Sequence, residues 1–267
     1  MSAAKPAPTA GAAPALGEEL LRRFDTPGPR YTSYPTADRF VEAFGADDAV
    51  RALQQRATGP GIVAALPLSL YLHIPFCESV CYYCACNKII TRHHGRAAPY
   101  LDALEAEIAL VVQHLGRGQP VSQLHFGGGS PTFLSDDEIA RVMAALHAAF
   151  AVGSGVEASI EVDPRTVTPE RLEFLRRAGF NRISFGVQDF DPQVQQAVHR
   201  VQPFDSVRDL MHAARRLGFQ SINADLIYGL PRQTPESFAR TVQQIGELRP
   251  DRIALYAYAH LPQRFKP

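Results

Sequence analysis

Four cysteines lie close together in the run Cys77-Glu-Ser-Val-Cys81-Tyr-Tyr-Cys84-Ala-Cys86, and the chain contains no others. The spacing CxxxCxxC of Cys77, Cys81 and Cys84 lets one loop turn three thiolates toward one face of an iron–sulfur cube. Three protein ligands leave one iron open, and an open position is where a small molecule can coordinate. The sequence therefore predicts a [4Fe–4S] cluster held by these three cysteines.

A structural zinc site that uses all four cysteines is the alternative that the motif leaves open. Zinc sites usually combine two short-spaced pairs of ligands that are separated by a dozen or more residues, whereas these thiols are crowded into one loop. A disulfide framework would distribute its cysteines along the chain. The clustering therefore favours metal binding in a reducing compartment, and we expect a cytoplasmic protein.

Six apolar runs with the character of β-strands must position this loop, and amphipathic helices separate them. Ser135 with Glu138 predicts a capping box at the start of one helix, and Thr168-Pro169 and Thr234-Pro235 predict the starts of two more. Strands that alternate with helices indicate a parallel sheet. The expected strands are residues 68–74, 121–126, 157–162, 182–187, 222–228 and 252–258.

Polar residues suited to chemistry recur where each expected strand ends. An open, doubly wound sheet would gather such residues mainly at one switch point, whereas a barrel collects them at the carboxyl ends of all its strands. We therefore predict an α/β fold, a partial TIM-like (β/α)6 barrel with an N-terminal extension. The strand-end residues are the cysteine loop, Gly127–Gly129, Glu161, Gln188, Asp225 and Ala259-His260.

Composition narrows the class of protein further. The chain has 267 residues, 46% of them hydrophobic, and 27 basic residues balance 27 acidic ones. A neutral chain lacks the electrostatic footprint of a nucleic-acid-binding protein, and no apolar run reaches the roughly 18 residues of a membrane span. We expect residues 1–17 to be a disordered tail, 18–68 an N-terminal extension near the active site, and 69–267 the barrel core.

The CxxxCxφC motif, with the aromatic residue Tyr83 at φ, resembles the radical S-adenosylmethionine (SAM) superfamily. That resemblance implies that SAM binds the open iron and is split by reduction into methionine and a 5′-deoxyadenosyl radical. Further runs resemble the oxygen-independent coproporphyrinogen III oxidases within this superfamily, over residues 18–267. These runs are LYLHIPFCESVCYYCACNKIITR, HFGGGSPTFL, SIEVDPR, GFNRISFGVQDF, NADLIYGLPRQTPESF, YAYAHLP and PGPRYTSYPTADRF.

The resemblance to these oxidases implies a reaction and its partners. Two propionates of coproporphyrinogen III become vinyl groups, which gives protoporphyrinogen IX in heme biosynthesis. The radical takes a hydrogen from the propionate β-carbon, and the substrate then loses carbon dioxide and one electron. Two SAM molecules, an electron donor such as flavodoxin or ferredoxin, and a monomeric protein are implied as well.

The resemblance also assigns SAM contacts that single residues would not reveal. A tyrosine in a strand is more often part of the core, a lone glycine run is usually a turn, and an arginine such as Arg200 is more often a solvated charge. Asp225 differs, because burying a carboxylate without partners is costly. Gln188, Arg200 and Asp225 are implied contacts of the second SAM. The remaining implied contacts are Tyr71, Gly128, Gly129, Ser130, Glu161 and Ala259.

Heme-binding chaperones of the same superfamily are the alternative function. They generally lack the fourth cysteine and the RYTSYP-like segment, which are present here as Cys86 and residues 30–35. Cys86 matches a family cysteine that is not a cluster ligand, and Arg30 and Tyr31 are candidates for holding substrate propionates. The family continues beyond the sixth strand with a helix and a C-terminal domain. We therefore expect this chain to be truncated, with an exposed apolar flank and weak or absent turnover.

Overall fold

The computed structural model of the chain describes residues 17–26, 36–58 and 66–260. The chain divides into two compact units, residues 1–50 and 51–267. The first unit contains α1 (Glu18–Phe24), η1 (Ala37–Arg39) and the start of α2 (Ala46–Thr58). This division falls earlier in the chain than the boundary expected after residue 68. Residues 1–16, Arg30 and Tyr31 lie outside the described residues.

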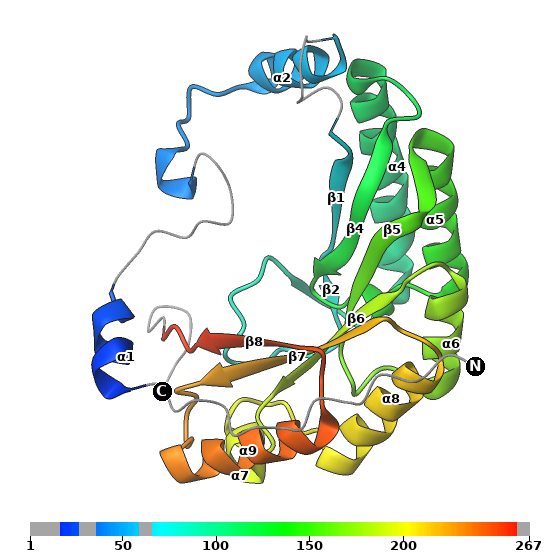
Figure 1. Cartoon of the computed structure of the whole chain (residues 1–267). Helices are drawn as coiled ribbons and strands as arrows, with labels where there is room; N and C mark the ends of the chain where they lie inside the picture. The colour runs from blue at the N-terminus through cyan, green and yellow to red at the C-terminus, as the bar shows by residue number, and fades with distance from the viewer. Residues whose placement is uncertain (1–16, 27–35, 59–65, 261–267) are drawn as a thin grey trace, which may run out of the picture. The chain divides into compact units, whose positions relative to one another are not determined.

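The second unit is built on a parallel sheet whose strands follow one another in sequence order. The sheet is curled into part of a barrel, with helices along its outer face (Figure 1). This arrangement confirms the predicted α/β partial barrel. Within residues 66–260 its six strands are β1 (Leu68–Ile74), β4 (Pro120–Gly128), β5 (Ala151–Val162), β6 (Arg182–Gln188), β7 (Ser221–Tyr228) and β8 (Arg252–Ala257).

The connecting helices begin where their capping residues predict. Ser135 and Glu138 form the expected capping box, and the side chains of Thr168 and Thr234 accept hydrogen bonds from their helices. Two other helices begin at Ala97 and Phe204, and neither has a side-chain hydrogen bond that caps its start. The elements are η2 (His94–Arg96), α4 (Ala97–Leu115), η3 (Pro131–Phe133), α5 (Asp136–Ala149), α6 (Pro169–Arg177), α7 (Pro192–Ala197), α8 (Phe204–Arg216) and α9 (Pro235–Leu248).

The two faces of the sheet differ in polarity because side chains alternate along each strand. Phe126, Ile160 and Phe185 are fully buried in the core between sheet and helices. Their neighbours in sequence point to the concave face, where Ser184 donates a hydrogen bond to Asp225. The core therefore lies between sheet and helices, and the concave face carries the polar groups.

A short two-stranded pairing lies at one end of the sheet, and a bulge lies at the other. At its carboxyl end, β2 (Phe76–Cys77) pairs with β3 (Ile89–Ile90) and closes the cysteine loop. At its amino end, β5 is longer than predicted: Val152 pairs with Val121, but the next pair is Glu157 with Gln123. The residues between Val152 and Glu157 therefore form a bulge.

Among the described residues, β8 is the last strand of the sheet and carries exposed apolar side chains. Ile253 and Leu255 are about half exposed (53% and 54%), as is Val242 on α9 (48%). The exposed apolar flank expected from the sequence is therefore present. No helix in the described part of the chain is both long and apolar enough to cross a membrane.

Candidate active site

The cysteine loop is held in place at both of its ends. Main-chain hydrogen bonds join the end of the loop to its beginning: Ile89 N donates to Pro75 O (2.7 Å), and Thr91 N donates to Cys77 O (2.8 Å). A turn inside the loop is closed by Cys84 N donating to Cys81 O (3.1 Å). The three predicted ligand cysteines thus lie on one short, closed segment at the carboxyl end of β1.

The thiols differ in their electrostatic surroundings. The pKa of Cys84 is lowered to about 5, because the Cys86 thiol hydrogen-bonds to it and the Lys88 ammonium lies nearby. The same hydrogen bond, together with burial, raises the pKa of Cys86. Burial raises the pKa of Cys77, although a hydrogen bond from Ser130 acts in the opposite direction. Of these three thiols, Cys84 is therefore the one most readily present as thiolate, which is the form that binds metals.

Cys81 is the buried thiol of the loop, and two arginines approach its sulfur. Arg200 Nη1 lies 3.4 Å from Cys81 Sγ, and Arg165 Nη2 lies 3.6 Å from it. Both guanidinium groups also contact Asp163, at 3.3 Å and 2.6 Å. No group of three or more His, Cys, Asp or Glu side chains within the described residues is arranged to hold a single metal ion.

The glycine turn at the end of β4 packs against the main chain that leads to the cysteines. Gly129 N donates to Ile74 O (2.8 Å), and Ser130 N donates to Phe76 O (2.8 Å). A Cβ on Gly129 would lie 2.8 Å from Phe76 O, and Gly128 has φ +113°, which favours glycine. These glycines are therefore required for the backbone to pass this close to the cysteine loop.

Glu161 is partly exposed on the concave face and has two partners there. One carboxylate oxygen lies 3.1 Å from His125 Nε2, and the other accepts a hydrogen bond from Gly128 N at 3.3 Å. The His125 ring stacks on Tyr71, at 5.7 Å between centroids, and the Tyr71 hydroxyl lies 3.0 Å from His73 Nδ1. The carboxylate is thus oriented by its neighbours while remaining accessible.

The remaining predicted contacts lie along β6, β7 and the end of β8. Gln188 has φ +67°, which is uncommon for a residue with a side chain. Asp225 accepts hydrogen bonds from Ser184 (2.9 Å) and Asn223 (2.7 Å). Burial raises the pKa of Asp225 to about 6. Ala259 is exposed just beyond β8.

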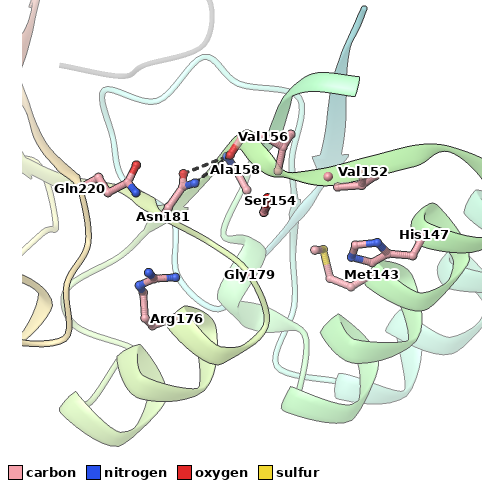
Figure 2. Close-up of a pocket in the computed structure, with 11 residues that line it drawn as sticks. Met143, His147, Val152, Ser154, Val156, Ala158, Arg176, Gly179, Asn181 and Gln220 are labelled. Atoms are coloured by element: carbon pink, nitrogen blue, oxygen red, sulfur yellow. Dashed lines mark hydrogen bonds between the residues drawn. The ribbon is translucent and has the colours of Figure 1, made fainter. Parts of the chain in front are cut away.

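A cavity of about 310 Å³ lies at the opposite, amino-terminal end of the sheet (Figure 2). Met143, Val152 and Val156 line it together with polar side chains. Asn181 is committed to the main chain there, since it hydrogen-bonds Ala158 N (3.0 Å) and Val156 O (2.7 Å). The predicted site residues lie elsewhere, so this cavity is separate from the cysteine site.

Nothing in the sequence alone places Asp163, Arg165 or Arg200 beside Cys81. Asp163 and Arg165 stand in the quoted run SIEVDPR but had no assigned role, and Arg200 was expected at a SAM molecule rather than beside a thiol. The sequence feature that could have indicated these contacts is Asp163, a carboxylate that directly follows an apolar strand. His125 has no role predicted from the sequence, and its contact with Glu161 places it in the site.

Comparison with known proteins agrees with this geometry. The profile of the radical SAM superfamily matches residues 71–245. The chain is 52% identical over 251 residues to an oxygen-independent coproporphyrinogen III oxidase of Pseudomonas aeruginosa, covering 93% of this chain and 54% of that protein. It is 49% identical over 246 residues to the Escherichia coli protein of the same name, covering 92% and 52%. The chain therefore spans about half the length of the curated relatives it matches.

Solved structures agree with the sequence comparisons. The structure described as coproporphyrinogen III oxidase from Escherichia coli, a radical SAM enzyme, superposes with a TM-score of 0.82 at 47% identity. The match covers 93% of this chain and 54% of that one. A radical SAM methyltransferase from Kitasatospora setae, at 15% identity and a TM-score of 0.51, covers 72% of this chain and 34% of its own, and it shares the fold alone.

Proposed function

The chain belongs to the radical SAM superfamily, and on that premise we propose that it forms the cofactor-binding core of an oxygen-independent coproporphyrinogen III oxidase. The superfamily uses a [4Fe–4S] cluster and SAM. In this proposal two propionates of coproporphyrinogen III are converted to vinyl groups, which yields protoporphyrinogen IX. The names of relatives that are 43–52% identical support this function over that of a heme chaperone.

The observation that carries the proposal is the loop that holds Cys77, Cys81 and Cys84 beside the glycine turn and Glu161. Its donor set fits an iron–sulfur cluster, because soft thiolates are the usual ligands of such clusters. The lowered pKa of Cys84 favours a thiolate at neutral pH. Cys86 hydrogen-bonds Cys84 and is proposed to be a neighbour of the cluster rather than a ligand.

The chain's own residues would bind and orient SAM. The cluster, which Cys77, Cys81 and Cys84 would hold, and SAM would supply radical chemistry that removes a hydrogen atom from the substrate. Main-chain groups at Gly128, Gly129 and Ser130 would meet the methionine part of SAM, since glycine permits close approach of a ligand. The Glu161 carboxylate would accept hydrogen bonds from the ribose hydroxyls, while the contact between His125 Nε2 and one carboxylate oxygen keeps the side chain oriented.

The finer assignments are part of the same proposal. Tyr71 stands on the concave face next to His125, where it would border the first SAM. The proposed contacts of a second SAM are Gln188, Arg200, Asp225 and Ala259. We further propose a flavodoxin or ferredoxin as electron donor, a cytoplasmic location and a monomer. Residues 18–68 would serve as an extension near the active site.

Anaerobic reconstitution of the purified chain with iron and sulfide tests the cluster. We expect about four iron and four sulfide per chain, and 5′-deoxyadenosine when SAM and dithionite are added. Cys84→Ser should lose iron, whereas the matched variant Cys86→Ser should retain it. Zinc in place of iron, or equal loss from both variants, would contradict the ligand assignment.

Coproporphyrinogen III supplied to the reconstituted chain tests the substrate. The products, oxidised to porphyrins and separated by chromatography, should include species that have lost one or two carboxyl groups. Because weak or absent turnover is expected of this chain, missing products refute the proposed substrate only if coproporphyrinogen III also fails to bind the reconstituted chain. Cleavage of SAM alone leaves the cofactor assignment intact. Tight heme binding without decarboxylation would instead favour the chaperone function.

A further inference from the structure

Two cationic side chains and one carboxylate surround the Cys81 sulfur. Arg165 Nη2 and Arg200 Nη1 both donate toward Cys81 Sγ, at 3.6 Å and 3.4 Å. Asp163 Oδ2 receives both of these nitrogens, at 2.6 Å from Arg165 and 3.3 Å from Arg200. These three residues, which we call the Cys81 triad, lie 82 to 119 positions away from Cys81 in the sequence.

The charges of the triad do not balance. Arg200 and Asp163 are buried, at 7% and 8% exposure. Burial alone would raise the pKa of Asp163, but the two arginines outweigh that effect and hold its pKa below the ordinary value. Asp225 also lies within electrostatic reach of Arg200, but it makes its hydrogen bonds to other side chains. Two guanidinium groups thus share one ion-paired carboxylate, and the excess positive charge faces Cys81.

The backbone fixes this arrangement. Arg165 N donates to Asp163 Oδ1 (3.0 Å), which sets the turn directly after β5. Arg200 Nη2 donates to Gly186 O (2.7 Å), and a Cβ on Gly186 would lie 2.8 Å from that same nitrogen. Gly186 therefore provides the space that Arg200 occupies. Burying a charge is costly unless it is paired, and buried Arg200 is paired with buried Asp163. Arg165, whose side chain keeps 22% of its area accessible, supplies the excess positive charge beside the proposed cluster ligand.

We propose that Arg165, held by Asp163 and acting with Arg200, raises the reduction potential of a cluster bound through Cys81. This inference rests on the proposed function, because it requires the cluster. Reduction adds one negative charge to the cluster, and nearby positive charge stabilises the reduced form more than the oxidised form. Hydrogen bonds to the ligand sulfurs and the net local charge are established determinants of iron–sulfur potentials. Arg165 acts through Cys81 and is therefore a positioning residue.

Removing the charge of Arg165 and removing the charge of Asp163 should shift the reduction potential in opposite directions. Arg165→Gln removes a positive charge and should lower the potential. Asp163→Asn removes the compensating negative charge and should raise it. Arg165→Lys keeps the charge and should fall between Arg165→Gln and the unaltered protein. A role confined to packing would not produce shifts of opposite sign.

Redox titration of the reconstituted chain, followed by the EPR signal of the reduced cluster, measures these shifts. At a fixed solution potential, Arg165→Gln should reduce the ratio of reduced to oxidised cluster about tenfold, or ~59 mV for a one-electron couple. Asp163→Asn should increase the same ratio. Arg208→Gln on α8 is the matched control, because its guanidinium is exposed and pairs with Asp205 and Asp209.

Each outcome separates this inference from the proposed function. If the unaltered chain binds no iron, the proposed function fails. If it binds iron and all variants share one potential, only the inference is overturned. Loss of iron from Arg165→Gln with retention in Arg165→Lys would show a structural role and would also overturn it.

Discussion

Replacing Asp225 with asparagine should stabilise the metal-free protein at neutral pH. Asp225 lies on the concave face of β7, and burial raises the pKa of its carboxyl from the ordinary 3.8 to about 6. In Asp225→Asn, the oxygen of the new amide would keep the hydrogen bond from Asn223. The NH2 group of that amide can donate to the Ser184 hydroxyl, because a hydroxyl both donates and accepts.

The magnitude follows from the raised pKa. A tenfold change in an ionisation constant corresponds to about 1.4 kcal/mol, so ionised Asp225 lowers the free energy of unfolding by ~3 kcal/mol. Because the folded-state pKa is raised, the wild-type stability is complete below about pH 4 and is lost as the pH rises through about 6. The advantage of Asp225→Asn should thus be about 1 kcal/mol near pH 4.5 and about 3 kcal/mol near pH 7.5.

Urea unfolding of both metal-free proteins at several pH values measures this difference. Near pH 7.5 the melting temperature should also rise, by about 2–4 °C for each kcal/mol. Asp209→Asn on the exposed surface of α8 is the control and should change stability by less than about 0.5 kcal/mol at any pH. A pH-independent difference, or a destabilised Asp225→Asn, would refute the reasoning. A carboxylate that costs stability is typical of a binding site, where a cationic ligand would recover that cost.

Three further outcomes are expected. Gly129→Ala should weaken SAM binding to the reconstituted chain and lower the free energy of unfolding by about 1–3 kcal/mol, because its Cβ would clash with the main chain just before Cys77. The control Gly153→Ala, whose Cβ meets no neighbour, should change neither SAM binding nor stability. Equal effects of the two variants would refute this account. Thr234→Ala should lower the free energy of unfolding by about 1 kcal/mol in urea, and an unchanged value would show that the cap is unimportant. In the metal-free protein, iodoacetamide at about pH 6.5 should modify Cys84 before Cys77, because the pKa of Cys84 is lowered and that of Cys77 is raised. Peptide mass spectrometry reports the order of modification, and equal rates would contradict this expectation.

Much of the fold could be predicted because the local signals agree with the packing. The runs around Ile160 and Phe185 alternate between core and concave face, as a half-buried parallel strand requires. Helix starts at Thr168 and Thr234 follow from cap chemistry, which depends only on neighbouring residues. Local patterns of this kind are read directly from the sequence.

The features that escaped prediction are short, aperiodic or long-range. Helix α7 has six residues, too few to show a helical period, although Asp191 caps it. The first half of β5 contains Gly153 and Gly155, which favour a turn over a strand. The approach of Arg165 and Arg200 to Cys81 joins distant segments, and only the curled sheet brings them together.

The bulge of β5 has a practical consequence for work on this protein. Gly153, Ser154 and Gly155 are exposed, and side chains added at either glycine would enter open space. The cysteine loop lies at the other end of the sheet, where β1 and β4 have seven and nine residues. Seven residues span about 23 Å at 3.3 Å per residue. Lengthening a surface loop costs little conformational free energy. An affinity tag or fluorescent reporter inserted at Ser154 would therefore leave the cluster loop undisturbed, and it would provide a handle for immobilisation under anaerobic conditions.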